Sequence, residues 1–177
     1  MQSNQSSTLE AVKEQTDSAA FGVILPLLAF AVPFAVSHPQ WLTGTLVNCF
    51  LLLAAATCSR RSLAGVIVLP SIGAVANGLL FGTFTTFLLW FLPFIWVGNW
   101  IFVTTFERMR NTVRGALAMI IGAVLKSALL GATALVLVRL SLVPSVFLTA
   151  MSVFQLVTAL AGGFLALGIL RFTHTHD

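Results

Sequence analysis

The chain has 177 residues, of which 58% are hydrophobic and 8% are charged, whereas soluble domains carry about 25% charged residues. Nine Lys and Arg residues and five Asp and Glu residues are too few to cover a water-soluble surface of this size. We therefore interpret the chain as an integral membrane protein and exclude a soluble enzyme. Six spans of about 20 residues use about two thirds of the chain, which leaves no room for an extramembrane domain.

The net charge of +4 does not indicate nucleic acid as a partner. The basic residues stand in twos and threes at the ends of apolar stretches, and no basic stripe with interleaved aromatics is present. Cys49 and Cys58 lie nine residues apart on one expected helix, which separates them by about 13 Å, too far for a disulfide. They fit no metal-ligand pattern, and the sequence predicts neither a metal nor a cofactor.

Residues 1–17 are polar. We expect a cytoplasmic tail over 1–17, a transmembrane domain over 18–171 and a short tail over 172–177. Six apolar stretches predict a compact all-α bundle of six transmembrane helices, over 19–36, 42–58, 62–81, 84–106, 115–138 and 146–170. Pro70, Gly73 and Gly78 in the third stretch leave a five-span arrangement with one re-entrant segment as an alternative.

The charges between the stretches predict the orientation of the chain. With six spans, one side of the membrane holds seven basic residues, namely Lys13, Arg60, Arg61, Arg108, Arg110, Arg114 and Arg171. The other side holds Arg139. By the positive-inside rule, this bias puts both termini in the cytoplasm of a multi-pass plasma-membrane protein.

Lys126 is a charged residue within the expected spans. It is twelfth in the 24-residue fifth stretch, and its stem of about 6 Å cannot easily reach across about 15 Å to an interface. It should face the bundle interior, at a cost of about 2.5 to 3.5 kcal/mol, yet the spans contain no Asp or Glu. Either an anionic substrate supplies the counter-charge, or carbonyls and amides of neighbouring helices solvate a structural lysine.

Four stretches each carry one amide that should point inward, namely Asn48, Asn77, Asn99 and Gln155. For any one of them, a hydrogen bond between helices is the simpler interpretation. Together with Lys126 they favour a polar central site. On the sixth stretch, small and polar residues step by three or four, which suits either lining a cavity or packing closely on a neighbour. These are Thr149, Ser152, Gln155, Ala159 and Gly162.

The fourth stretch is rich in aromatic residues, and lipid contact explains most of them. Trp96 and Trp100 lie one turn apart and Asn99 follows Trp96 by three residues, so this group could stack on a flat ligand and hydrogen-bond to it. Pro93 predicts a bent helix or a free carbonyl near the same level. No pair of titratable groups in the spans could act as acid and base, so we do not expect an enzyme.

The chain also lacks the parts of a self-powered transporter. Proton- and sodium-driven carriers commonly need a carboxylate near the midplane, and the ATP-binding pattern GxxxxGK followed by Ser or Thr is absent. A transport function would therefore take its energy from partner chains. The alternatives are an accessory or structural subunit of a membrane complex, whose polar residues only join helices, and a stand-alone facilitator.

Five sets of residues carry a family resemblance. They are Pro39-Gln40-Trp41-Leu42-Thr43-Gly44 with Asn48, Leu69-Pro70-Ser71, Pro93-Phe94-Ile95-Trp96-Val97-Gly98-Asn99, Leu125-Lys126, and Gln155-Leu156 with Thr158-Ala159-Leu160 and Gly162-Gly163. In these strings the chain resembles the substrate-binding S components of energy-coupling factor (ECF) transporters, and more narrowly a short subgroup whose substrate is unassigned.

The resemblance implies a six-helix subunit that captures a small organic micronutrient, vitamin-like and anionic or aromatic, for ATP-driven uptake by an ABC transporter. The partners it implies are a transmembrane coupling subunit and two cytoplasmic ATPases. Metal-transporting members use an N-terminal histidine segment. The N-terminal stretch of this sequence has no histidine, so we do not expect a metal substrate. The substrate-binding candidates are Lys126, Asn99, Gln155, Asn48, Asn77, Trp96 and Trp100.

Members of this family often dock on the coupling subunit through an Ala-xxx-Ala surface on the first helix. Two pairs of small residues have this spacing here, Ser18-xxx-Gly22 and Ala31-xxx-Ala35. Pro33 interrupts the second pair. The resemblance therefore implies a docking face on the first helix without fixing which pair forms it.

Overall fold

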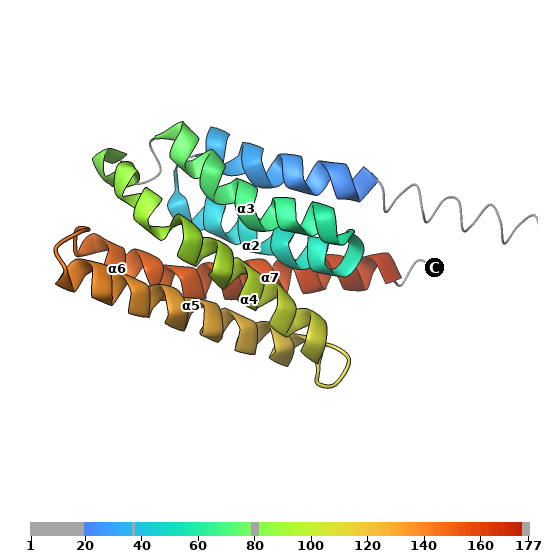
Figure 1. Cartoon of the computed structure of the whole chain (residues 1–177). Coiled ribbons are helices and arrows are strands. Elements are labelled where there is room, and N and C mark those ends of the chain that lie inside the picture. The colour runs from blue at the N-terminus through green and yellow to red at the C-terminus, as the bar shows by residue number, and fades with distance from the viewer. Residues whose placement is uncertain (1–19, 37, 79–81, 175–177) are drawn as a thin grey trace, which may run out of the picture.

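A computed structural model describes residues 20–36, 38–78 and 82–174 of the chain. These residues form a bundle of helices with no strand among them (Figure 1). The expected all-α fold is therefore confirmed. Residues 1–17, expected to form the N-terminal tail, lie outside the described residues.

Each apolar stretch of the sequence contains a helix close to its expected bounds. The N-terminal helix spans Ala20–Ala35. It is followed by α2 (Gln40–Thr57), α3 (Arg60–Asn77), the 3-10 helix η1 (Gly82–Phe91), α4 (Leu92–Met109), α5 (Gly115–Arg139), α6 (Val146–Met151) and α7 (Val153–His174). Pro70 lies inside α3, which continues to Asn77, so the described part of the third stretch contains no re-entrant break.

Two expected helices are not regular α-helices throughout. The fourth stretch is a 3-10 helix up to Phe91 and an α-helix from Leu92. Phe91 keeps helical backbone angles, so the helix changes type here without ending, and Pro93 lies in the first turn of α4, where its missing N–H is not needed. The sixth stretch breaks at Ser152, whose φ of −112° and ψ of −83° are not helical. Ser127 Oγ of α5 donates to the Ser152 carbonyl at 2.7 Å and so fixes the break.

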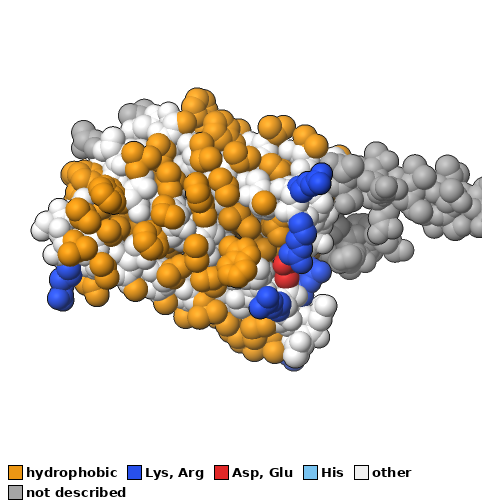
Figure 2. All heavy atoms as spheres, in the orientation of Figure 1, with side chains coloured by type: hydrophobic (Ala, Val, Ile, Leu, Met, Phe, Trp, Pro, Cys, Tyr) orange, Lys and Arg blue, Asp and Glu red, His pale blue; other side chains and the backbone are white. Residues whose placement is uncertain are grey.

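Among the described residues, four segments are long and apolar enough to cross a membrane, namely Gln40–Thr57, Phe84–Met109, Gly115–Arg139 and Val146–Phe172. The N-terminal helix is apolar but shorter. Large hydrophobic side chains remain exposed on these helices, and Figure 2 shows them spread over one face of the bundle. A surface of this kind fits lipid better than water.

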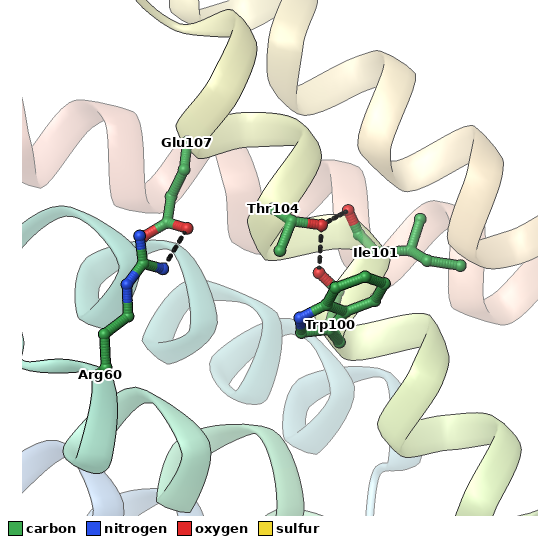
Figure 3. A network of polar contacts seen from close by, with 5 residues as sticks. All are labelled: Arg60, Trp100, Ile101, Thr104 and Glu107. Atoms are coloured by element: carbon green, nitrogen blue, oxygen red, sulfur yellow. Dashed lines mark hydrogen bonds and ion pairs between the residues drawn. The ribbon is translucent and has the colours of Figure 1, made fainter.

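Basic side chains gather at one end of the bundle (Figure 2). The N-terminal helix begins and α7 ends at this same end (Figure 1). Arg60 Nη1 of α3 and Glu107 Oε2 of α4 form an ion pair of 2.7 Å there (Figure 3). Because the Arg60 side chain is 78% exposed, the pair adds only about 0 to 1 kcal/mol to stability. Arg139 ends α5 at the opposite end of that helix from Arg114.

Helices α2 and α7 approach each other closely where they cross at Gly162. A Cβ atom on Gly162 would overlap the Thr45 carbonyl oxygen and lie 2.7 Å from the Cys49 nitrogen. Only glycine fits at this position without moving α2. Of the two expected uses of the small-residue stripe, close packing is therefore the one observed at Gly162.

We expect Gly162→Ala to destabilise the protein by about 1 to 3 kcal/mol, or to prevent folding, because the added methyl group must separate α2 from α7. Gly168→Ala is the matched control, since its Cβ would meet no atom within 4 Å. Thermal unfolding of both variants in detergent, followed by tryptophan fluorescence, measures the difference. Equal unfolding temperatures would contradict the close contact.

Candidate functional site

A partly open cavity of about 100 Å³ lies in the bundle. Its wall includes Gln40 and Thr43 in the first turn of α2, Leu88 of η1, and Met151 at the end of α6. Helix α2 starts at Gln40 and ends beside Arg60. The cavity therefore occupies the half of the bundle away from the basic end.

Four of the candidate binding residues line this cavity, namely Asn48, Asn99, Lys126 and Gln155. They come from α2, α4, α5 and α7, so each of these four helices contributes one of the candidates to a shared space. Asn48, Asn99 and Lys126 are each only 2% exposed. The expected inward orientation of Lys126 is confirmed.

Lys126 has neutral neighbours. Its Nζ donates to Asn48 Oδ1 at 2.6 Å and lies 5.6 Å from the centroid of the Phe102 ring, within range of a cation–π contact. Gly98 of α4 makes room for the stem, since a Cβ there would lie 3.3 Å from Lys126 Cγ. An ammonium group has three N–H donors, and no carboxylate lines the described wall of the cavity.

Asn48 is held so that its oxygen faces the lysine. Asn48 Nδ2 donates to the Gly44 carbonyl at 2.8 Å and to Thr158 Oγ1 at 3.4 Å. Both partners are acceptors, so they select the amide orientation that leaves Oδ1 for Lys126. The Thr158 hydroxyl in turn donates to the Phe154 carbonyl at 2.8 Å. Asn48 therefore joins α2, α5 and α7 around the cavity.

Only one of the two polar atoms in the Asn99 side chain has a hydrogen-bond partner among the described residues. Its Nδ2 donates to the Ile67 carbonyl of α3 at 3.0 Å, while its Oδ1 is buried and has no hydrogen-bond partner among the described residues. A buried acceptor without a donor costs about 1 to 3 kcal/mol. The residues that line the cavity thus include a cationic donor, Lys126, and a buried acceptor without a partner, Asn99 Oδ1.

Three candidate residues do not line the cavity. Asn77 Nδ2 donates to the Phe34 carbonyl of the N-terminal helix. Trp96 Nε1 donates to Ser71 Oγ at 2.7 Å. Trp96 therefore holds Ser71, which lines the cavity, without lining the cavity itself. Trp100 is 53% exposed and belongs to the outer surface of α4. The structure therefore separates Trp96 and Trp100 from the space that Asn99 lines.

Sequence reasoning did not select several polar wall residues and the aromatic partner of the lysine. Thr43, Ser71 and Thr158 line the cavity. The Phe102 ring lies within cation–π range of the Lys126 ammonium group. A weak signal existed for Thr158, which follows Gln155 by three residues and so shares its helix face. Nothing in the sequence distinguishes Phe102 from the lipid-facing aromatics of the same stretch.

The small-residue pairs of the N-terminal helix have different surroundings. A Cβ on Gly22 would lie 3.1 Å from Ser62 Oγ, so Gly22 faces α3 inside the bundle. Ala31 and Ala35 are exposed. Ser18 lies outside the described residues.

The arrangement is that of a small binding site, with hydrogen-bonding groups at one level of an otherwise apolar cavity. Comparisons of the chain with protein-family models, with characterised proteins and with solved structures find no match.

We expect the Lys126–Asn48 contact to show strong thermodynamic coupling. Asn48→Leu leaves the Lys126 ammonium without its acceptor. It should therefore lower the free energy of unfolding by about 1 to 3 kcal/mol more in the wild-type protein than in the Lys126→Met variant. Chemical unfolding of the two single variants and the double variant in detergent measures this difference. The control cycle combines Asn77→Leu with Lys126→Met, for which we expect additive effects. Additivity in the first cycle would contradict the contact.

Proposed function

We propose that the chain is the membrane-embedded substrate-binding subunit of an ECF-type ABC importer, which captures a small organic micronutrient for ATP-driven uptake. The observation that carries this proposal is the cavity at Lys126, where a buried ammonium group meets a neutral amide and an aromatic ring instead of a carboxylate. An anionic ligand would supply the missing counter-charge. The resemblance of the sequence to S components supports the same function.

The proposed topology has six spans in the plasma membrane with both termini in the cytoplasm. It is supported by the basic residues at the end where the N-terminal helix begins and α7 ends. With this orientation the cavity lies in the outer half of the membrane. A site in that half is suited to capturing a solute from outside the cell.

In this proposal the chain is not an enzyme, and separate ATPases supply the energy through a transmembrane coupling subunit. The exposed pair Ala31 and Ala35 is the better docking candidate of the two pairs, because Gly22 already packs against α3. Small side chains allow the close approach of a partner helix in a membrane.

One observation favours a second function, that of an accessory subunit of a membrane complex. The Asn48 amide bonds directly to Lys126, which is the arrangement expected if neighbouring helices merely solvate a structural lysine. This alternative does not account for the unused Asn99 oxygen. We therefore rank it below the binding subunit.

We expect the tagged protein, purified from its native host in a mild detergent, to bring down a membrane coupling subunit and two ATPases. Mass spectrometry identifies the proteins and any small molecule that elute with it. Recovery with a different membrane complex would support the accessory subunit. Recovery of the tagged protein without partner proteins, together with ATP-independent solute flux into liposomes that contain it, would support a facilitator.

A reporter fused after the last residue tests the topology. We expect a C-terminal fluorescent protein that folds only in the cytoplasm to be bright, and a C-terminal phosphatase that folds only outside to be inactive. The same pair fused after Arg139, which follows five of the six proposed spans, should give the opposite result. An active phosphatase at the C-terminus would contradict the proposed orientation.

A further inference from the structure

We propose that the cavity binds a small monocarboxylate that also carries a hydroxyl or N–H donor, with its carboxylate on Lys126 and its donor on Asn99. This names the substrate class of the proposed importer and rests on that function for its biological role. The binding chemistry itself follows from two groups that the protein leaves incompletely used.

The first group is the Lys126 ammonium. It is buried, and the described residues offer it one hydrogen-bond acceptor, Asn48 Oδ1 at 2.6 Å. A neutral amide solvates the charge without cancelling it, whereas a carboxylate does both and forms a short charge-assisted hydrogen bond. Because the described wall contains one cation, a ligand with a single negative charge makes the cavity neutral. A phosphate dianion would leave a net negative charge in an apolar cavity, which is unfavourable.

The second group is the Asn99 carboxamide oxygen. Its own nitrogen is occupied by the Ile67 carbonyl at 3.0 Å, which fixes the amide with Oδ1 unpartnered and buried. Such an oxygen accepts a hydrogen bond and cannot donate one. It therefore requires a donor on the ligand, and a bare carboxylate offers none. Asn99 and Lys126 line the same small cavity, so one small molecule in it could contact both residues.

The size and lining of the cavity limit the rest of the ligand. Its volume is about 100 Å³, while an engineered cavity of about 150 Å³ holds benzene. Because the cavity is smaller than that, its enclosed part takes a short branched chain or part of a single ring, and the rest of a ring would lie in the opening. Leu88, Ile95 and Phe154 contribute apolar wall, which suits a hydrocarbon body between the two polar groups.

The test uses the full chain in lipid nanodiscs and matched sets of probes. The binding probes are 3-hydroxybenzoate, 4-hydroxybenzoate and 3-hydroxybutyrate, detected by thermal shift and calorimetry. Each is compared with the analogue without the hydroxyl (benzoate or butyrate) and with the corresponding carboxamide. We expect at least one hydroxy acid to bind, and both of its analogues to bind at least tenfold more weakly. An amide or a deoxy acid that binds equally well overturns the proposal.

Two variants assign the groups. Lys126→Met should remove the preference for the acid over its amide, and Asn99→Leu should remove the preference for the hydroxy acid over its deoxy analogue. Asn77→Leu is the control, because Asn77 bonds to the N-terminal helix and does not line the cavity; it should keep both preferences. Unchanged preferences in the first two variants overturn the assignment.

A third variant tests the carboxylate position without removing Lys126. Asn48→Asp places a carboxylate beside Lys126, so it should abolish binding of the hydroxy acids. Because its second oxygen cannot replace the hydrogen bond from Asn48 Nδ2 to the Gly44 carbonyl, a cooperative thermal transition is used to show that the variant is folded. Undiminished binding of the hydroxy acids to Asn48→Asp, or no binding of any probe to the wild type, overturns the proposal. Decanoate and inorganic phosphate should not bind. Preferential binding of decanoate would identify a lipid carboxylate and overturn the soluble ligand.

These outcomes separate the ligand class from the proposed function. Recovery of the coupling subunit and ATPases without carboxylate binding would retain the importer and reject the ligand class. Selective carboxylate binding without those partners would retain the site and reject the importer.

Discussion

A lysine ammonium in the middle of an apolar bundle must be solvated by the protein, and much of the described architecture serves this constraint. Asn48 of α2 bonds to Lys126 of α5. At Asn48, α2 also lies against α7, and that close approach depends on the missing side chain of Gly162. Gly98 makes space for the lysine stem, and Phe102 presents its ring to the charge. Four helices are thus positioned around one cation.

This solvation stabilises the charge without neutralising it. A purely structural position would be more stable with methionine or leucine, which need no partner in an apolar interior. The unsatisfied oxygen of Asn99 adds a second cost at the same cavity. Incompletely satisfied polar groups that cluster in one cavity are typical of binding sites, where a ligand completes their hydrogen bonds.

Hydropathy and charge predicted the all-α fold, the helix positions and the inward direction of Lys126, because burying a charge in lipid is costly. The change from 3-10 to α-helix after Phe91 and the break at Ser152 were not predicted, since both flanks are equally apolar; Pro93 indicated only a bend near the first of them. Lipid and protein core also select the same side chains. The sequence therefore could not show that Trp100 is 53% exposed while Phe102, two residues later, is buried, nor which amide reaches the lysine.

The two halves of the bundle differ in a way that limits how a ligand could move. Around the cavity the wall contains hydrogen-bonding groups, but toward the basic end the interior is filled by tightly packed apolar side chains, including Leu51, Val66, Phe106 and Met119. A solute that enters the cavity meets Lys126 and finds this packed core beyond it. Passage through the bundle would require the helices to separate, at the cost of that packing. A subunit that binds its ligand on one side and is moved by partner proteins avoids this cost, which favours a binding subunit over a pore.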